Sequence, residues 1–83
     1  MSIAKYCKEN GLNKEEYKQF TNNIKETATA MKSTLKYNGG MYYKVSELFK
    51  WNANEDIKHF LIQELKDLGI EFFQDNELYR VTE

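Results

Sequence analysis

One long stretch without a helix-breaking residue constrains this chain more than any other feature. Asn13 is followed three residues later by Glu16, which is the pattern of an N-terminal capping box. No proline occurs anywhere, and the next strong stop is Asn38-Gly39-Gly40. The sequence therefore predicts a helix over residues 14–37, about 36 Å long. In a chain of 83 residues, the other elements must pack against this helix.

The residues before this stretch predict a second, shorter helix. Ser2 is a suitable N-cap, residues 3–9 favour helix, and Asn10-Gly11 ends it. The apolar residues of the long helix form one stripe at 100° per residue. We expect this stripe to face a core, although a two-stranded coiled coil has similar spacing. The stripe consists of Tyr17, Phe20, Ile24, Ala28, Met31 and Leu35.

Length and composition exclude several classes of protein. A chain of 83 residues builds one small core, and its 14% aromatic content argues against disorder. One cysteine and one histidine form neither a disulfide framework nor a zinc site. No apolar run is long enough to span a bilayer, and the charged N-terminus does not resemble a signal peptide, so we expect a cytoplasmic protein.

Motifs that carry catalysis are absent from the sequence. It contains no glycine-rich phosphate loop, no nucleophile elbow and no paired-carboxylate motif. We therefore expect a protein that is not an enzyme, without catalytic residues, metal, cofactor or small-molecule substrate.

A stripe of lysines runs along the long helix beside the apolar stripe. It consists of Lys14, Lys18, Lys25, Lys32 and Lys36, within about 40° of arc. Such a row can bind a line of phosphates, one charge every turn or two. Lysines that flank an apolar face can equally be a solvated edge whose stems cover the core. The sequence leaves both interpretations open.

The run from Ser2 to Asn13 resembles the helix-turn-helix of transposase-like and related mobile-element DNA-binding proteins. Cys7 stands four residues before the turn glycine, Gly11, and Leu12 follows it. Tyr17 and Phe20 supply the aromatic positions of the second helix. The resemblance implies that the first two turns of the long helix enter the major groove. The implied contacts are Lys14, Lys18, Gln19 and Asn22.

The second half of the chain predicts a strand over residues 41–45 and a short helix over residues 46–50. A longer helix begins after Asn54 and ends at Leu68, with Gly69 as its C′ residue. Residues 70–73 and 78–81 then predict two strands joined by a tight turn.

This order of elements, with Leu65 to Ile70 leading into a hairpin, resembles a winged-helix domain. The predicted class is mainly α with a small β-hairpin (α+β), a winged-helix-like helix-turn-helix domain with a long N-terminal helix. The chain is one domain over residues 1–83. Residues 2–37 form the helix, turn and long helix, and residues 41–83 form the strand, short helix, helix and hairpin wing.

The formal net charge of −1 conceals two halves of opposite sign. Residues 1–40 hold seven lysines and four glutamates, whereas residues 41–83 hold five basic and nine acidic groups. The basic half fits phosphate, and the acidic half would repel it. A possible protein-partner face on the acidic half comprises His59, Ile62, Glu71, Asp75 and Glu77.

Two functions follow from this asymmetry. The first is a small DNA-binding protein, a regulator or accessory factor of a phage or other mobile element. It would contact DNA through Lys14, Lys18, Gln19, Asn22, Lys25, Lys32 and Lys36. The second is a protein-binding module or inhibitor whose acidic face docks on a nucleic-acid enzyme. A homodimer through the long helix is compatible with either function.

Overall fold

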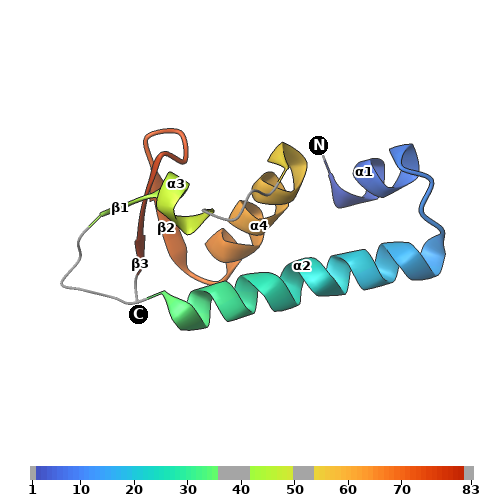
Figure 1. Ribbon diagram of the computed structural model, residues 1–83, viewed down its shortest axis with the longest axis horizontal. Coiled ribbons are helices and arrows are strands. Elements are labelled where there is room, and N and C mark those ends of the chain that lie inside the picture. Colours follow the sequence, from blue (N-terminus) through green and yellow to red (C-terminus); the bar gives the residue numbers. More distant parts are fainter. Residues whose placement is uncertain (1, 36–41, 50–53, 82–83) are drawn as a thin grey trace.

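A single long helix organises the molecule. The computed structural model describes residues 2–35, 42–49 and 54–81, and in Figure 1 the other helices and the sheet lie on one side of the long helix. The elements in chain order are α1 (Ile3–Glu9), α2 (Lys14–Thr34), β1 (Tyr43–Lys44), α3 (Val45–Leu48), α4 (Glu55–Asp67), β2 (Ile70–Phe73) and β3 (Leu78–Val81). The described residues are mainly helical with a small antiparallel sheet, so the predicted α+β class is confirmed.

Side-chain caps start the helices where the sequence predicts them. The Glu16 backbone N–H donates to Asn13 Oδ1 (2.9 Å), and the Asn13 N–H donates to Glu16 Oε1 (3.0 Å). These two bonds complete the capping box of α2. Ser2 and Asn54 cap α1 and α4 with their side-chain oxygens. Gly11 takes a φ of 70° just after α1, which a residue without Cβ adopts at little cost.

The C-terminal end of α2 comes earlier than predicted. The helix ends at Thr34, three residues before position 37, and Leu35 is extended with φ −72° and ψ 128°. The Thr34 hydroxyl donates to the Met31 carbonyl at 2.9 Å, a local bond that competes with the helical ladder. Leu35 leaves the helix and packs against the core. The predicted stop at Gly39-Gly40 lies outside the described residues.

The core lies between α2 and α4 and continues onto the sheet. Ala28, Leu61 and Leu65 are 0% exposed, and the small side chain of Ala28 lets α4 approach α2 closely. The apolar stripe of α2 therefore packs within the chain at Ile24 and Ala28, as expected for a core-facing helix. The buried residues of this cluster are Ile24, Ala28, Phe49, Phe60, Leu61, Ile62, Leu65, Ile70, Tyr79 and Val81.

Tyr17 does not share this core, contrary to the prediction from its spacing. Its side chain is 38% exposed. Three aromatic rings close the core one turn further along, because Phe20 stacks on Tyr6 of α1 (5.3 Å between centroids) and meets Phe60 of α4 edge-on (6.0 Å). Such pairs contribute about 0.5–1.5 kcal/mol each beyond their buried area. The first turn of α2 lies on the N-terminal side of these three rings, outside the core.

The sheet has the strand order β1-β3-β2, with both pairs antiparallel. The two predicted hairpin strands have the predicted bounds. The first strand is shorter than predicted, because α3 begins at Val45 rather than at Ser46. Tyr43 is paired with Tyr79 and their rings stack at 5.3 Å, so β1 is joined to the hairpin by side chains as well as by backbone.

The β2–β3 turn has an unusual backbone. Gln74, Asp75 and Asn76 are consecutive non-glycine residues with φ values of 50°, 57° and 68°. The left-handed region costs an ordinary L-residue roughly 1–2 kcal/mol, and asparagine and aspartate somewhat less. The Glu77 N–H donates to the carbonyls of Phe73 and Gln74 (3.1 Å each), which closes the turn. The turn thus holds the backbone of three polar residues in a strained conformation.

Candidate nucleic-acid interface

The predicted phosphate contacts within the described residues lie along α2, and all of them are exposed. They are Lys14, Lys18, Gln19, Asn22, Lys25 and Lys32, and we call this set without Gln19 the lysine face. Lys36, the seventh predicted contact, lies outside the described residues. Gln19 is displaced from Lys18 by about 100° around the helix, so it faces a different direction from the lysines.

The first two turns of the lysine face form a shallow hollow of about 310 Å³. Tyr17 lies in this hollow together with Lys14 and Lys18. The sequence had predicted that this tyrosine belongs to the core. Asn22 borders the same hollow, and the Thr21 hydroxyl at its edge donates to the Tyr17 carbonyl (3.0 Å). The structure therefore adds an exposed phenol to three of the predicted contacts.

Two acidic residues, Glu15 and Glu16, lie in the first turn of α2 close to the lysines, but they face other directions. Glu16 accepts the Asn13 N–H through its side chain, so its carboxylate is held at the N-cap. It is also separated from Lys14 by about 160° around the helix, on nearly the opposite side. Glu15 is exposed and lies about 100° from Lys14. Both carboxylates stabilise the positive end of the helix dipole.

The fourth lysine of the face has a different role. Lys32 Nζ donates to the carbonyl oxygen of Leu68 at 2.5 Å. Leu68 is the C-cap of α4, where unpaired carbonyls and the negative end of the helix dipole favour a cation. Lys32 thus connects α2 to the end of α4. In the described residues, no hydrogen bond or ion pair engages the ammonium groups of Lys14, Lys18 or Lys25.

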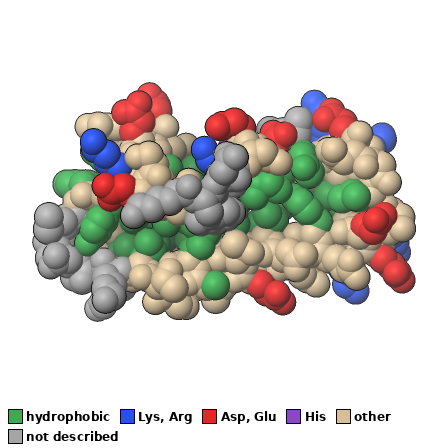
Figure 2. All heavy atoms as spheres, in the orientation of Figure 1, with side chains coloured by type: hydrophobic (Ala, Val, Ile, Leu, Met, Phe, Trp, Pro, Cys, Tyr) green, Lys and Arg blue, Asp and Glu red, His purple; other side chains and the backbone are tan. Residues whose placement is uncertain are grey.

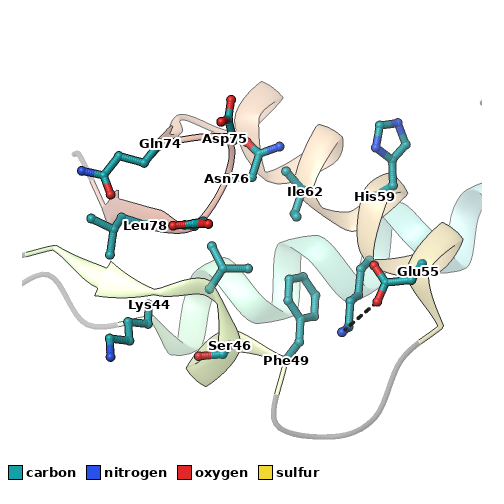
Figure 3. Close-up of a pocket in the computed structure, with 13 residues that line it drawn as sticks. Lys44, Ser46, Phe49, Glu55, His59, Ile62, Gln74, Asp75, Asn76 and Leu78 are labelled. Atoms are coloured by element: carbon teal, nitrogen blue, oxygen red, sulfur yellow. Dashed lines mark ion pairs between the residues drawn. The ribbon is translucent and has the colours of Figure 1, made fainter.

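A second concave surface lies on the acidic half of the molecule. The turn groove, as we name it, is a hollow of about 820 Å³ between α3, α4 and the β2–β3 turn (Figure 3). Its apolar floor consists of Val45, Phe49, Ile62 and Leu78. Its polar rim consists of Lys44, Ser46, Glu55, Lys58, His59, Gln74, Asp75, Asn76 and Glu77.

Four of the five residues of the predicted partner face border this groove. Ile62 is only 8% exposed and belongs to the core cluster, yet Figure 3 shows its side chain directed toward the hollow. His59 is exposed and points away from the centre of the hollow. Asp75 and Glu77 come from the turn. Glu71 does not line the groove and instead pairs with Arg80 at 2.9 Å.

Acidic side chains are visible on the groove side of the molecule. In Figure 2 they lie above the hairpin turn and the start of α4, while hydrophobic side chains form a band between α2 and the elements above it. Within the described residues, segments 42–49 and 54–81 carry four basic and eight acidic side chains. Segment 2–35 carries six lysines and four glutamates, so the two parts of the described chain differ in the sign of their net charge.

Possible metal ligands and ionisable side chains bear on chemical reactivity. No group of three potential metal ligands occurs among them. The single cysteine, Cys7, is buried, and burial raises the pKa of its thiol, which favours the unreactive neutral form. Burial also raises the pKa of the Tyr79 phenol, with smaller contributions from Glu47 and Tyr43. In these segments, no helix combines the length and the hydropathy needed to cross a membrane.

Comparison with known proteins identifies no relative of this chain: no family model, no curated protein and no solved structure matches it.

Proposed function

We propose that this chain is a small DNA-binding protein with a winged-helix-like arrangement that contacts the phosphate backbone through the lysine face of α2. The order long helix, strand, short helix, helix and hairpin supports the winged-helix comparison. The antiparallel pairing of β1 with β3 adds to this support, because it joins the early strand to the hairpin in one sheet.

One observation carries this proposal: Tyr17 lies exposed beside Lys14 and Lys18 in a hollow on α2. Lysine, tyrosine and asparagine are all side chains that donate hydrogen bonds to phosphate oxygens. Lys14 and Lys18 are about 6 Å apart along the helix axis, and Lys25 follows about 10 Å further on. Each strand of duplex DNA carries one negative charge per roughly 3.4 Å of the helix axis, so one strand can meet all three lysines.

The chemistry of phosphate contact makes the proposal measurable. Anisotropy of a fluorescent duplex of mixed sequence should show binding at low salt that weakens as the salt concentration rises. Each single replacement of Lys14, Lys18 or Lys25 by glutamine should reduce the magnitude of the slope of log K against log salt by about one unit. The triple charge reversal K14E/K18E/K25E should abolish binding.

A matched control comes from the groove side of the molecule. Lys44→Gln removes the same charge from an exposed lysine on the rim of the turn groove and should leave the salt slope unchanged. Absence of binding at low salt would contradict the proposal. Equal losses for Lys18→Gln and Lys44→Gln would also contradict it, because they would show that net charge rather than the lysine face drives association.

The proposal extends to a biological role, that of a regulator or accessory factor of a phage or other mobile element. It rests on the resemblance of residues 2–13 to a helix-turn-helix. In the structure, α1 and α2 are joined by a turn at Gly11, and the Leu12 N–H donates to the Cys7 carbonyl at 2.9 Å. Selection of preferred sites from a random duplex library would test for the sequence preference that a regulator requires.

A further inference from the structure

The turn groove offers an apolar floor that a side chain from another molecule can reach. Val45 and Leu78 are partly exposed, and Ile62 borders the space between them. In Figure 3 the side chains of Phe49 and Ile62 point toward the hollow from opposite sides. Apolar surface at the bottom of a polar-rimmed hollow is the usual form of an anchor site for one aliphatic or aromatic side chain.

The rim above this floor is held in place by the backbone. The Val45 N–H donates to the Glu77 carbonyl at 3.0 Å, which joins the start of α3 to the β2–β3 turn. The turn itself is closed by two hydrogen bonds from the Glu77 N–H. Strained backbone of the kind seen at Gln74 and Asp75 occurs where side chains are held for contact. A rim fixed before binding loses little conformational freedom when a partner docks.

The charge of the rim selects the partner. The rim carries three carboxylates and two lysines. Glu55 is paired with Lys58 at 3.5 Å, so Asp75 and Glu77 outnumber Lys44 among the rim charges that no ion pair engages in the described residues. The groove also lies on the part of the chain where acidic side chains outnumber basic ones by eight to four. Phosphate groups are repelled by such a surface, and cationic side chains are attracted to it.

We infer that the turn groove binds a segment of a partner protein in which an apolar side chain is flanked by lysine or arginine. The apolar side chain enters between Ile62 and Leu78, and the flanking cations pair with Asp75 and Glu77. This surface is built by α3, α4 and the turn, whereas the lysine face is built by α2 alone. The inference therefore does not depend on DNA binding.

Blocked tripeptides test the inference on the full chain labelled with nitrogen-15. Lys-Leu-Lys should shift the amide resonances of Val45, Ile62 and Leu78 and saturate in the millimolar range. Lys-Ser-Lys lacks the apolar anchor and Glu-Leu-Glu has the wrong charge, so each should bind at least tenfold more weakly. Equal binding of Glu-Leu-Glu, or shifts confined to other residues, would overturn the inference.

Variants of the protein separate charge from packing. The double reversal D75K/E77K should weaken Lys-Leu-Lys binding at least tenfold, while E64K/D67K, with the same charge change on α4 outside the groove, should change it less than twofold. D75N/E77Q gives the same test without introduced lysines, should the reversal disturb the turn. Val45→Thr, which keeps the volume but adds a hydroxyl to the floor, should weaken binding several-fold. Unchanged binding in D75N/E77Q would overturn the inference.

The fluorescent duplex provides the last test. If it perturbs groove resonances instead of the amides of α2, the groove is a nucleic-acid surface and the inference fails. Binding of Lys-Leu-Lys by K14E/K18E/K25E would support the groove even if the protein binds no DNA.

Discussion

The two ends of α2 have the same kind of sequence but different surroundings. Both ends carry an apolar residue every three or four positions and lysines on the neighbouring flank. At the C-terminal end, Met31 packs against the core and Lys32 is bonded to Leu68. At the N-terminal end, Tyr17 and Lys18 remain exposed.

The difference has a geometric cause. α2 has 21 residues and is about 31 Å long, whereas the 13 residues of α4 extend about 20 Å. One helix cannot cover the other along its whole length, and α1 covers only the part near Phe20. Periodicity therefore identifies the apolar face of a helix, but the length of its neighbour decides how much of that face is buried.

The largest expected contrast is between two truncations on the same stripe. Ile24→Ala removes a side chain that is 5% exposed and should lower the free energy of unfolding by about 2–5 kcal/mol. Tyr17→Ala, two turns earlier, should cost less than about 1 kcal/mol because this side chain is 38% exposed and lies outside the core cluster. Urea denaturation followed by circular dichroism measures both values. Equal losses would show that Tyr17 is part of the core after all.

A smaller effect is expected at the start of α2. The exposed turns there have little tertiary support, so we expect them to depend on the capping box. Asn13→Ala should lower the free energy of unfolding by about 1 kcal/mol and speed hydrogen exchange at the Tyr17 amide. Asn23→Ala is the control, since that exposed asparagine lies inside the helix and alanine favours helix. A loss of the same size in the control would contradict the assigned role of the cap.

The smallest contrast separates two lysines of one stripe. Lys32→Gln removes the hydrogen bond to Leu68 and should lower the free energy of unfolding by about 0.5–1 kcal/mol. Lys18→Gln should leave stability within about 0.5 kcal/mol of the parent but reduce the affinity for DNA. Thermal melts and anisotropy titrations of both variants give the comparison. The reverse pattern would mean that Lys32 and not Lys18 belongs to the phosphate contacts.

Local signals in the sequence predicted much of this fold. The caps at Asn13 and Asn54 are in place, as are the hairpin strands, because capping and strand alternation depend on residues close together in the chain. The pairing of β1 with β3 was not predicted, since it joins residues about 35 positions apart. The exposure of Tyr17 and the burial of Ile62 were not predicted for the same reason, because both depend on how far other elements of the fold extend.

The candidate site was predicted in part for the same reason. Spacing grouped Lys14 with Lys18, and the helix-turn-helix resemblance added Asn22; the structure places all three around one hollow. Spacing could not show that Lys32 meets the end of α4, because that contact is 36 residues away in sequence. The turn groove needed three elements to be placed together, although its charged residues Asp75 and Glu77 were visible as an acidic group.

The left-handed β2–β3 turn has a consequence for chemical synthesis of this protein. A positive φ is the relaxed conformation of a D-amino acid, just as a negative φ is for an L-amino acid. Gln74, Asp75 and Asn76 are therefore three adjacent sites where inverting the stereocentre should relieve strain. At 83 residues, the chain is short enough to be assembled from synthetic segments. A single mirror-image residue placed here would stiffen the rim of the groove and resist proteolysis at the same time.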